Sequence, residues 1–378
     1  MNTKNNAVYR LFFILAAVCA ALYIFFTIEK VHSTAGWLLV AFFVCLAVGF
    51  RGVKALRGFS YTVCILGAVC MAMYYPQYFS TIGDFKLSKL TIPLLQIIMF
   101  GMGTELSLKD FGEVMKAPKQ VVAGLICHFT IMPFLGLGIA MAFDFSGEIA
   151  AGIILIGCSP SGLASNVMSY LAKANLALSV CITALSTLLA PFLTPLLMKL
   201  LGGPYIQLDF WAMVWDISKI VLIPIAAGLV FNHFLHGKFG WLDKALPFAS
   251  MGGIMFIIII FIAAGRNNLL QVGLLLLLAV FIHNVGGFLI GYWVARLLRF
   301  PEKDCRTISI EVGMQNGGLA SGLALNMGKM ATVGLAPAIF GSLMNVTGST
   351  LASWWHNHLP EEDKQAAADT SLNPIVNP

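Results

Sequence analysis

The chain has 378 residues, of which 59% are apolar and only 11% are charged, and its formal net charge is +6. Soluble domains carry about 25% charged residues, so this composition excludes a soluble enzyme, a nucleic-acid binder and a disordered scaffold. It is typical of a membrane protein, in which the distribution of basic residues between the spans matters more than the net charge.

Long apolar runs follow one another along almost the whole chain. A helix needs about 20 apolar residues to cross a hydrocarbon core about 30 Å thick. The first run is longer than the core of a signal peptide and no small-residue cleavage site follows it, so we interpret it as an uncleaved helix. The runs predict twelve spanning helices: 8–28, 35–50, 59–75, 90–106, 120–143, 149–172, 175–200, 211–235, 246–265, 271–298, 304–328 and 331–356.

The basic residues predict the orientation of these spans. If the N-terminus is cytoplasmic, 16 of the 23 Lys and Arg residues lie in inside segments. This excess places both termini in the cytoplasm of a multi-pass protein of the cell (inner) membrane. We expect the polar, proline-containing tail 359–378 to be a disordered cytoplasmic segment. The seven exceptions are Lys30, Lys86, Lys89, Lys199, Lys219, Arg266 and Lys329.

Two of the predicted spans contain helix-breaking residues. Pro160 and Gly162 interrupt one span, Gly313 and Gly317 interrupt another, and the tetrapeptide Gly-Leu-Ala-Ser occurs at both places, at 162–165 and 318–321. Each break falls in the fourth helix of a set of five. An odd number of helices per set gives two inverted repeats, and broken helices at matching positions of such repeats are the best sequence indication of a transporter's binding site. Two kinked but otherwise ordinary spans are the alternative.

The predicted domains follow from this pattern. The spans form two additional N-terminal helices (1–57), a first five-helix repeat (58–200), an inverted second repeat (201–358) and the tail (359–378). The fold class is therefore an all-α polytopic membrane protein with two crossing broken helices.

Glu311 is the clearest ionisable residue at membrane depth. Counting at 1.5 Å per residue from Lys303 and Arg306 places it roughly 8 to 12 Å inside the membrane. A carboxylate at that depth is costly and functional by default. Its own and adjacent spans offer no basic partner at the same depth, so a bound cation would supply the missing countercharge.

Neutral polar residues converge on the same layer. Ser179 and Thr183 share a helix face through their i, i+4 spacing, and Asn166, His128 and Gln315 reach a similar depth. Neutral oxygens around a single carboxylate favour a hard, weakly charged cation such as Na⁺. A hydroxyl bonded back to its own helix is the alternative for each of the two alcohols.

Three segments of the sequence resemble the bile acid:sodium symporter family, bacterial branch. They are GMGTELSLKDF (101–111), PSGLASNVMSYLAKANLALSVCITALSTLLAPFLTPLL (160–197) and EVGMQNGGLASGLA (311–324). The similarity covers about residues 58–358. It implies a ten-helix fold, with a panel domain and a core domain, in the third to twelfth spans.

The resemblance also implies roles for individual residues. The first sodium site would contain Ser165, Asn166, Ser179, Thr183 and Glu311. The second sodium site would contain Glu311, the backbone carbonyls of Val312 and Met314, and Gln315. Asn316 and Asn345 would lie near an organic anion. The carboxylate of this anion would lie at the half-helix N-termini, beside Leu163 and Gly317.

The chain departs from the family's pattern at three places. His128 stands where the second sodium site usually receives a Gln, which leaves one or two coupled Na⁺ ions open. Leu163 and Ser161 replace residues of the family's Pro-Gly-Gly-Thr-Ala-Ser-Asn pattern, and Met344 precedes Asn345 where relatives can carry His. Leu163 makes the anion pocket less polar, so a bile acid and a small carboxylate such as pantoate or a 2-oxo acid are both open.

The sequence therefore predicts a secondary active symporter that couples inward Na⁺ movement to uptake of an organic anion by alternating access. Proton coupling through His128 and Glu311 is the alternative, because histidine titrates near physiological pH. An intramembrane enzyme is disfavoured because the paired aspartates of a metal-dependent lipid-phosphate transferase are absent from the sequence, and a receptor because there is no sizeable cytoplasmic segment.

Overall fold

The computed structural model describes residues 3–53, 56, 59–105, 118–145, 147–235 and 240–358. The predicted tail 359–378, residues 106–111 of the first motif, and Lys54, Arg57, Lys109, Lys116, Lys238 and Lys364 lie outside the described residues. The described chain is almost entirely helical, with one short antiparallel pair in which Thr81 faces Lys86.

The helices follow the order of the predicted spans. Seven of them, among the described residues, are long and apolar enough to cross a membrane, and three more are apolar but shorter. The protein is therefore an all-α polytopic membrane protein. The α-helices are α1 (Thr3–Ile28), α2 (His32–Phe50), α3 (Ser60–Tyr74), α4 (Thr91–Glu105), α6 (Pro118–Ala142), α7 (Gly147–Cys158), α8 (Ala164–Leu171), α9 (Leu176–Leu197), α10 (Phe210–Ile217), α11 (Ile223–Leu235), α12 (Gly240–Leu297), α13 (Glu302–Gly313), α14 (Gly317–Asn326) and α15 (Leu335–Asn357). Shorter elements are η2 (Pro76–Phe79), β1 (Thr81–Ile82), β2 (Phe85–Lys86), η3 (Leu87–Leu90) and the π-helical segments η4 (Met198–Gly202) and η5 (Ser218–Leu222).

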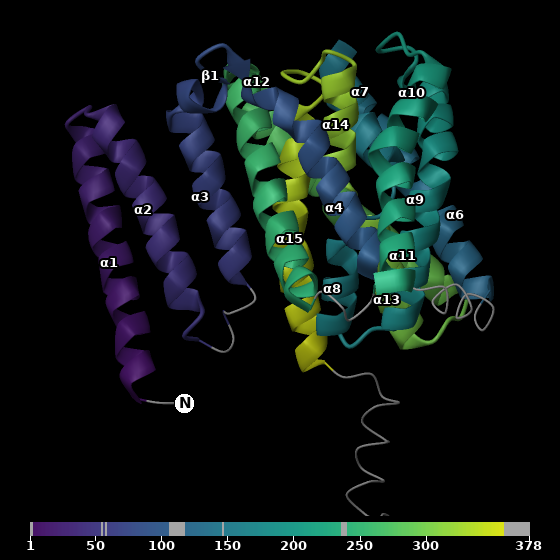
Figure 1. Cartoon of the computed structure of the whole chain (residues 1–378), viewed down its shortest axis with the longest axis horizontal. Coiled ribbons are helices and arrows are strands. Elements are labelled where there is room, and N and C mark those ends of the chain that lie inside the picture. The colour runs from purple at the N-terminus through teal and green to yellow at the C-terminus, as the bar shows by residue number, and fades with distance from the viewer. Residues whose placement is uncertain are drawn as a thin grey trace, which may run out of the picture.

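The first two helices form a hairpin at one side of the molecule, where α2 packs on α3 (Figure 1). The Tyr23 and Tyr74 hydroxyls are 3.1 Å apart, and the Trp37 ring stacks on Tyr75 with centroids 4.5 Å apart. Many large apolar side chains of α1, such as Ile14 and Phe25, are exposed, as expected for a surface that faces lipid. The hairpin thus adds to the fold without covering its centre.

The remaining helices pack as two groups. The first group contains α3, α4, α11 and the first half of α12. The second contains α6, α7, α8, α9, α13, α14, α15 and the second half of α12, and α10 packs against its α9 and α14. Nearly all of α7 and α13 is buried, including every residue from Ala150 to Cys158 and from Asp304 to Gly313. Interrupted helices are tolerated at membrane depth only where protein surrounds them, and the second group provides that surrounding.

Helix α12 differs from the sequence prediction. The spans expected at 246–265 and 271–298 are joined in one 58-residue stretch of helical backbone, which carries two separate apolar segments, Phe248–Gln271 and Gly273–Leu297. Residues 266–272 contain no proline or glycine that would interrupt the helical hydrogen bonds. The apolar pattern therefore locates two segments, whereas the backbone between them stays helical.

The start of α1 and the end of α15 lie at the same side of the molecule (Figure 1). The half-helices α8 and α13 lie toward this side, and α7 and α14 lie toward the opposite side (Figure 1).

Candidate functional site

Both predicted helix breaks are present. Helix α7 ends at Cys158 and α8 begins at Ala164, while α13 ends at Gly313 and α14 begins at Gly317. Pro160 has no amide hydrogen with which to continue α7. Each break therefore frees backbone donors and acceptors at membrane depth, and these need partners.

The two breaks cross and supply each other's partners. Gly162 N donates to Met314 O at 3.1 Å, and Asn316 N donates to Pro160 O at 2.8 Å, which forms an isolated antiparallel bridge between Ser161 and Gln315. A Cβ on Gly162 would lie 2.6 Å from the Gln315 carbonyl oxygen. Glycine is thus required at 162 for the two unwound segments to approach this closely.

Glu311 lies fully buried beside this crossing. Ser179 Oγ donates to Glu311 Oε1 at 2.5 Å, and Thr183 Oγ1 donates to Glu311 Oε2 at 2.8 Å. Asn166 Oδ1 lies 2.9 Å from Ser179 Oγ and 3.2 Å from Thr183 Oγ1, and Ser165 Oγ is 3.1 Å from Thr183 Oγ1. The structure therefore brings all five residues of the expected first sodium set into one cluster.

The hydroxyls of this cluster are shared between two acceptors. The Glu311 carboxylate and the Asn166 carbonyl oxygen both lie within hydrogen-bond distance of the Ser179 and Thr183 hydroxyls, and the Ser165 and Ser161 hydroxyls also bond Glu311. Among the described residues no ion pair involves Glu311. A buried carboxylate that lacks a basic partner, surrounded by neutral oxygens, has the donor chemistry that suits a monovalent hard cation.

In the expected second sodium set, most of the oxygen atoms already accept hydrogen bonds within the described structure. Gln315 Nε2 donates to Val312 O at 2.8 Å, and Met314 O accepts from Gly162 N and, at 3.3 Å, from Ser161 Oγ. Gln315 Oε1 is buried and has no partner within the described structure. An orphaned buried acceptor needs a donor or a cation, so Gln315 Oε1 is the atom of this set that fits an additional cation best.

His128 contacts the backbone of both broken helices. Its Nδ1 is 3.0 Å from Glu311 O and its Nε2 is 2.9 Å from Ser159 O. Both partners are carbonyl oxygens, so the ring bridges α6 to the two breaks through the backbone.

The residues expected near the anion divide between the two half-helices. Leu163 lies at the N-cap position of α8, where no side chain accepts from the helix. Asn316 Oδ1 accepts from Leu319 N at 2.9 Å and thereby caps α14. Gly317 packs against Gly341 of α15, and Asn345 Nδ2 donates to Gly341 O at 2.6 Å. Asn316, Gly317 and Asn345 thus gather at one place, whereas Leu163 lies on the other half-helix.

Other polar residues at the crossing were not selected from the sequence. Ser161 Oγ lies 3.4 Å from Ser165 Oγ, and Ser161 N donates to Ser186 Oγ at 3.3 Å. Asn284 of α12 reaches the end of α13, where its Nδ2 donates to Gly313 O. The adjacent polar pair His283-Asn284 inside an apolar run is a signal that could have identified this contact.

The two half-helices that start at the crossing are covered differently. Helix α8 packs on α9, α13 and α15, and its Val167 and Tyr170 are exposed. Helix α14 is covered by α4 and α10, and residues 319–324 are all buried. The crossing is therefore more enclosed on the α14 side.

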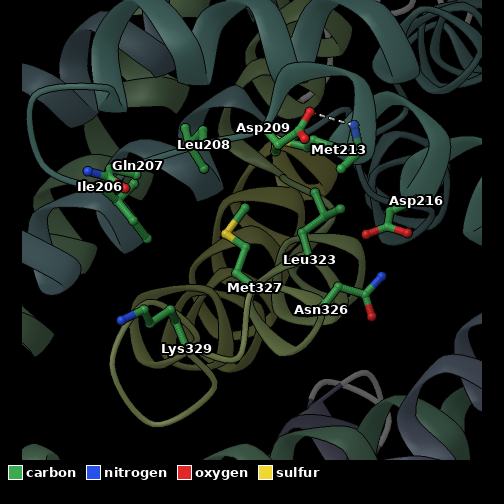
Figure 2. Close-up of a pocket in the computed structure, with 11 residues that line it drawn as sticks. Ile206, Gln207, Leu208, Asp209, Met213, Asp216, Leu323, Asn326, Met327 and Lys329 are labelled. Carbon is green, nitrogen blue, oxygen red and sulfur yellow. Dashed lines mark hydrogen bonds between the residues drawn. The ribbon is translucent and has the colours of Figure 1, made fainter.

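A pocket of about 240 Å³ lies on this α14 side, between α10 and α14. Figure 2 shows side chains of both helices, among them Asp209, Met213, Leu323 and Met327, gathered around it. None of the predicted site residues lines it. The pocket is thus separate from the cluster around Glu311.

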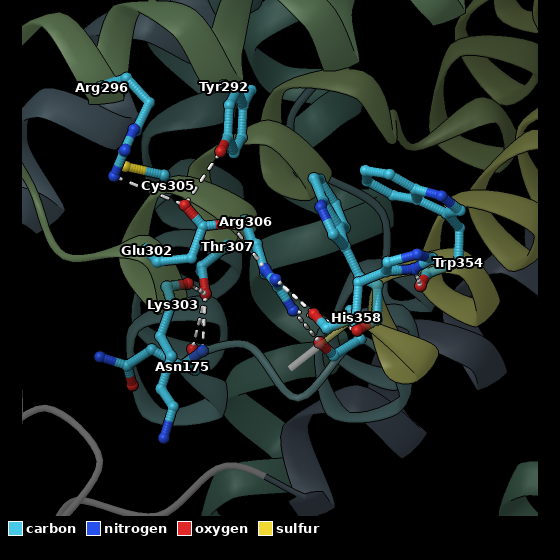
Figure 3. A network of polar contacts seen from close by, with 12 residues as sticks. Asn175, Tyr292, Arg296, Glu302, Lys303, Cys305, Arg306, Thr307, Trp354 and His358 are labelled. Atoms are coloured by element: carbon cyan, nitrogen blue, oxygen red, sulfur yellow. Dashed lines mark hydrogen bonds and ion pairs between the residues drawn. The ribbon is translucent and has the colours of Figure 1, made fainter. Parts of the chain in front are cut away.

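A polar network holds the opposite end of the second group together (Figure 3). Arg306 of α13 donates to Glu302 at 2.9 Å, to Ala172 O at 3.3 Å and to Trp355 O at 3.2 Å. These contacts join α13 to the ends of α8 and α15. Arg306 is buried and paired within this network, so it is not a surface residue, although the sequence used it to mark the membrane boundary.

Two unwound helices that cross beside a buried carboxylate, inside a polytopic helical protein, are features of a secondary transporter. The comparisons with known proteins agree with this class. Residues 92–272 match the model of the sodium bile acid symporter family. The chain is 39% identical over 322 residues to a Bacillus subtilis protein named as a sodium-dependent transporter, YocS. The aligned region covers 85% of this chain and 98% of that relative.

Plant proteins are also similar. The chain is 33% identical over 309 residues to a chloroplast protein of Oryza sativa named as a sodium/metabolite cotransporter, BASS1, with 80% of this chain and 74% of the relative covered. The corresponding Arabidopsis thaliana protein is 33% identical over 272 residues, covering 72% of this chain and 68% of the relative. The chain belongs to the sodium bile acid symporter family, and it is a sodium-coupled transporter and not an enzyme.

Proposed function

We propose that the protein imports an organic anion together with Na⁺ by alternating access of the two helix groups. The observation that carries this proposal is the cluster around Glu311, in which a buried carboxylate and four neutral side chains meet at the crossing of two broken helices. Glu311 would supply the charge at the ion site, and Ser165, Asn166, Ser179 and Thr183 would supply neutral oxygens. Gln315, with the carbonyls of Val312 and Met314, would serve a second ion.

The anion would bind at the N-termini of α8 and α14, beside the ions. Helix N-termini carry free N–H groups and a partial positive charge. No side chain caps α8. The amides of Ser165 and Asn166 already donate to the carbonyls of Gly162 and Leu163, so a carboxylate near Leu163 would interact chiefly with the partial positive charge of the helix N-terminus. Asn316 and Gly317 at the start of α14, together with Asn345 of α15, would complete the site. A bile acid and a small carboxylate such as pantoate or a 2-oxo acid are both candidate anions for this site.

The proposed topology follows the inverted repeat. We assign residues 58–200 and 201–358 to the two repeats, residues 1–57 to the additional helices, and both termini to the cytoplasmic side of the cell membrane. The Gly-Leu-Ala-Ser segments are 156 residues apart, and so are His128 and Asn284, each of which bonds a carbonyl at the end of a broken helix. The common separation supports equivalent roles in two related halves.

Proton coupling through His128 and Glu311 is the competing prediction. Both ring nitrogens of His128 lie within hydrogen-bond distance of backbone carbonyls of the two breaks. A neutral imidazole can donate to only one of these carbonyls, whereas the imidazolium donates to both, so this geometry keeps proton coupling as the alternative that the uptake experiment must separate.

Uptake by proteoliposomes separates the two coupling ions. Purified protein would be tested with radiolabelled pantoate, pyruvate and taurocholate, driven either by an inward Na⁺ gradient or by a pH gradient in choline buffer. We expect uptake of at least one anion under the Na⁺ gradient and none in choline. Uptake driven by the pH gradient alone, and unchanged by Na⁺, would contradict sodium coupling.

A further inference from the structure

The second half of α12 reaches one of the broken helices through a single side chain. Asn284 is fully buried, and its Nδ2 donates at 2.8 Å to the carbonyl of Gly313, the last residue of α13. The last carbonyls of a helix have no partner within the helix. Asn284 thus supplies a donor where α13 stops, just before the crossing.

The oxygen of the Asn284 amide contacts Thr347 of α15. Thr347 Oγ1 donates to Asn284 Oδ1. The Gly313 carbonyl can only accept, so it takes the amide nitrogen of Asn284, and Oδ1 is left to accept the Thr347 hydroxyl proton. Thr347 lies two residues after Asn345, on the helix that carries part of the proposed anion site.

The bonded carbonyl lies between two proposed ion ligands. Val312 and Met314 flank Gly313, and their carbonyls belong to the proposed second ion set. A Cβ on Gly287, one turn along α12 from Asn284, would lie 3.1 Å from Gly313 Cα, so α12 contacts the same residue of α13 a second time. Because the backbone has only two soft dihedrals per residue, fixing the Gly313 peptide limits the directions of the neighbouring carbonyls.

We propose that Asn284, held by Thr347, is a positioning residue that directs the Val312 and Met314 carbonyls toward the transported Na⁺. This inference rests on the proposed function. The pair also connects the proposed ion set to α15, the helix that carries Asn345 of the proposed anion site. Asn284 touches neither ion nor anion and acts through the Gly313 peptide.

Thr347→Val tests this role, because valine keeps the shape of the side chain and removes the hydroxyl that fixes Asn284. Thr350→Val is the matched control: Thr350 Oγ1 donates to Val346 O at 2.8 Å within its own helix, is exposed and lies one turn further along α15. Thr347→Ser keeps the hydroxyl. The half-saturating Na⁺ concentration would be measured both by thermal shift of the purified protein and by uptake in proteoliposomes.

We expect Thr347→Val to raise the half-saturating Na⁺ concentration about fivefold in both assays, with the maximal uptake rate changed less than twofold. Thr347→Ser and Thr350→Val should behave as wild type. If Thr347→Val does not purify as a folded protein, Thr347→Ala should give the same increase.

Equal Na⁺ dependence of Thr347→Val and Thr350→Val, in a protein whose wild type responds to Na⁺, would overturn the positioning role alone. A wild-type protein with no response to Na⁺ in either assay would overturn the proposed function, and this inference with it.

Discussion

Glu311 is the single residue on which ion binding depends most. Its carboxylate accepts from Ser179 and Thr183 and has no ion pair among the described residues. Glu311→Gln keeps the size of the side chain and removes its charge. We expect it to abolish the Na⁺-dependent rise in melting temperature that wild type shows by linkage of binding to folding.

Glu148→Gln is the control for Glu311→Gln. Glu148 is at the first turn of α7, where it contacts Lys329 and Thr332 at the opposite end from the crossing. Its variant should retain the Na⁺-dependent shift. A shift of wild-type size in Glu311→Gln would show that the ion binds elsewhere.

The hydroxyl of Thr183 provides a second test of the proposed ion site. Thr183→Val removes the donor to Glu311 Oε2, and a buried acceptor left without its partner costs about 1 to 3 kcal/mol. Because the hydroxyl is also a proposed ion ligand, the half-saturating Na⁺ concentration should rise about tenfold or more in thermal-shift titrations.

Thr187→Val is matched to Thr183→Val, since Thr187 is one turn later on α9 and donates only to the Thr183 carbonyl at 2.7 Å. It should leave the Na⁺ dependence unchanged. Equal effects of the two variants would indicate loss of helix stability and not of an ion ligand.

The sequence identified most of the residues in this cluster because depth could be counted from charged residues at the helix ends. Ser179 and Thr183 share a face through their spacing, and Glu311 stands out by its charge alone. The roles of Val312 and Met314 were implied by resemblance, and the structure shows their carbonyls already bonded within the crossing. Such contacts depend on which backbone atoms of two distant segments meet, and residue types do not encode that directly.

At the scale of elements, the contact between α4 and α14 is where the two groups of helices meet on the enclosed side. A Cβ on Gly322 would lie 2.4 Å from Leu95 Cδ1, and one on Gly318 would lie 3.0 Å from Leu95 Cδ2. Leu95 is buried, so it has little room to move away. In alternating access this contact must open and close.

Gly322→Val should therefore hold α4 and α14 apart and lower the uptake rate about tenfold, while the Na⁺-dependent thermal shift persists because the ion cluster is untouched. Adding Leu95→Ala should restore most of the rate. Gly138→Val is the control, since no atom lies within 4 Å of a Cβ at Gly138. Loss of uptake that Leu95→Ala does not relieve would contradict a steric cause.

The helix breaks could be predicted because proline and glycine act locally, as at Pro160 and Gly162. The continuity of α12 could not be predicted in this way. Hydropathy locates two apolar segments but does not determine the conformation of the backbone between them. The close approach of Leu95 to Gly318 and Gly322 was also beyond prediction, since it joins segments more than 200 residues apart.

For the whole molecule, the proposed ion site lies within one of the two groups of helices. Glu311, both breaks and the Arg306 network lie within the second group of helices, where α6, α9, α12 and α15 surround them. The first group contacts this unit through α4 on α14 and through α3 on α15, and α10 also packs on α14. The additional hairpin α1–α2 joins the periphery through α3, so we expect it to have no part in coupling.

Coupling itself can be measured as ion flux driven by the anion. Proteoliposomes with equal Na⁺ on both sides would receive an inward gradient of an anion found by the uptake screen, and entry of ²²Na⁺ would be followed. Sodium-coupled import predicts ²²Na⁺ accumulation in wild type that depends on the anion and disappears in Glu311→Gln. Entry of ²²Na⁺ that is the same with and without the anion gradient, while the anion itself is transported, would contradict it.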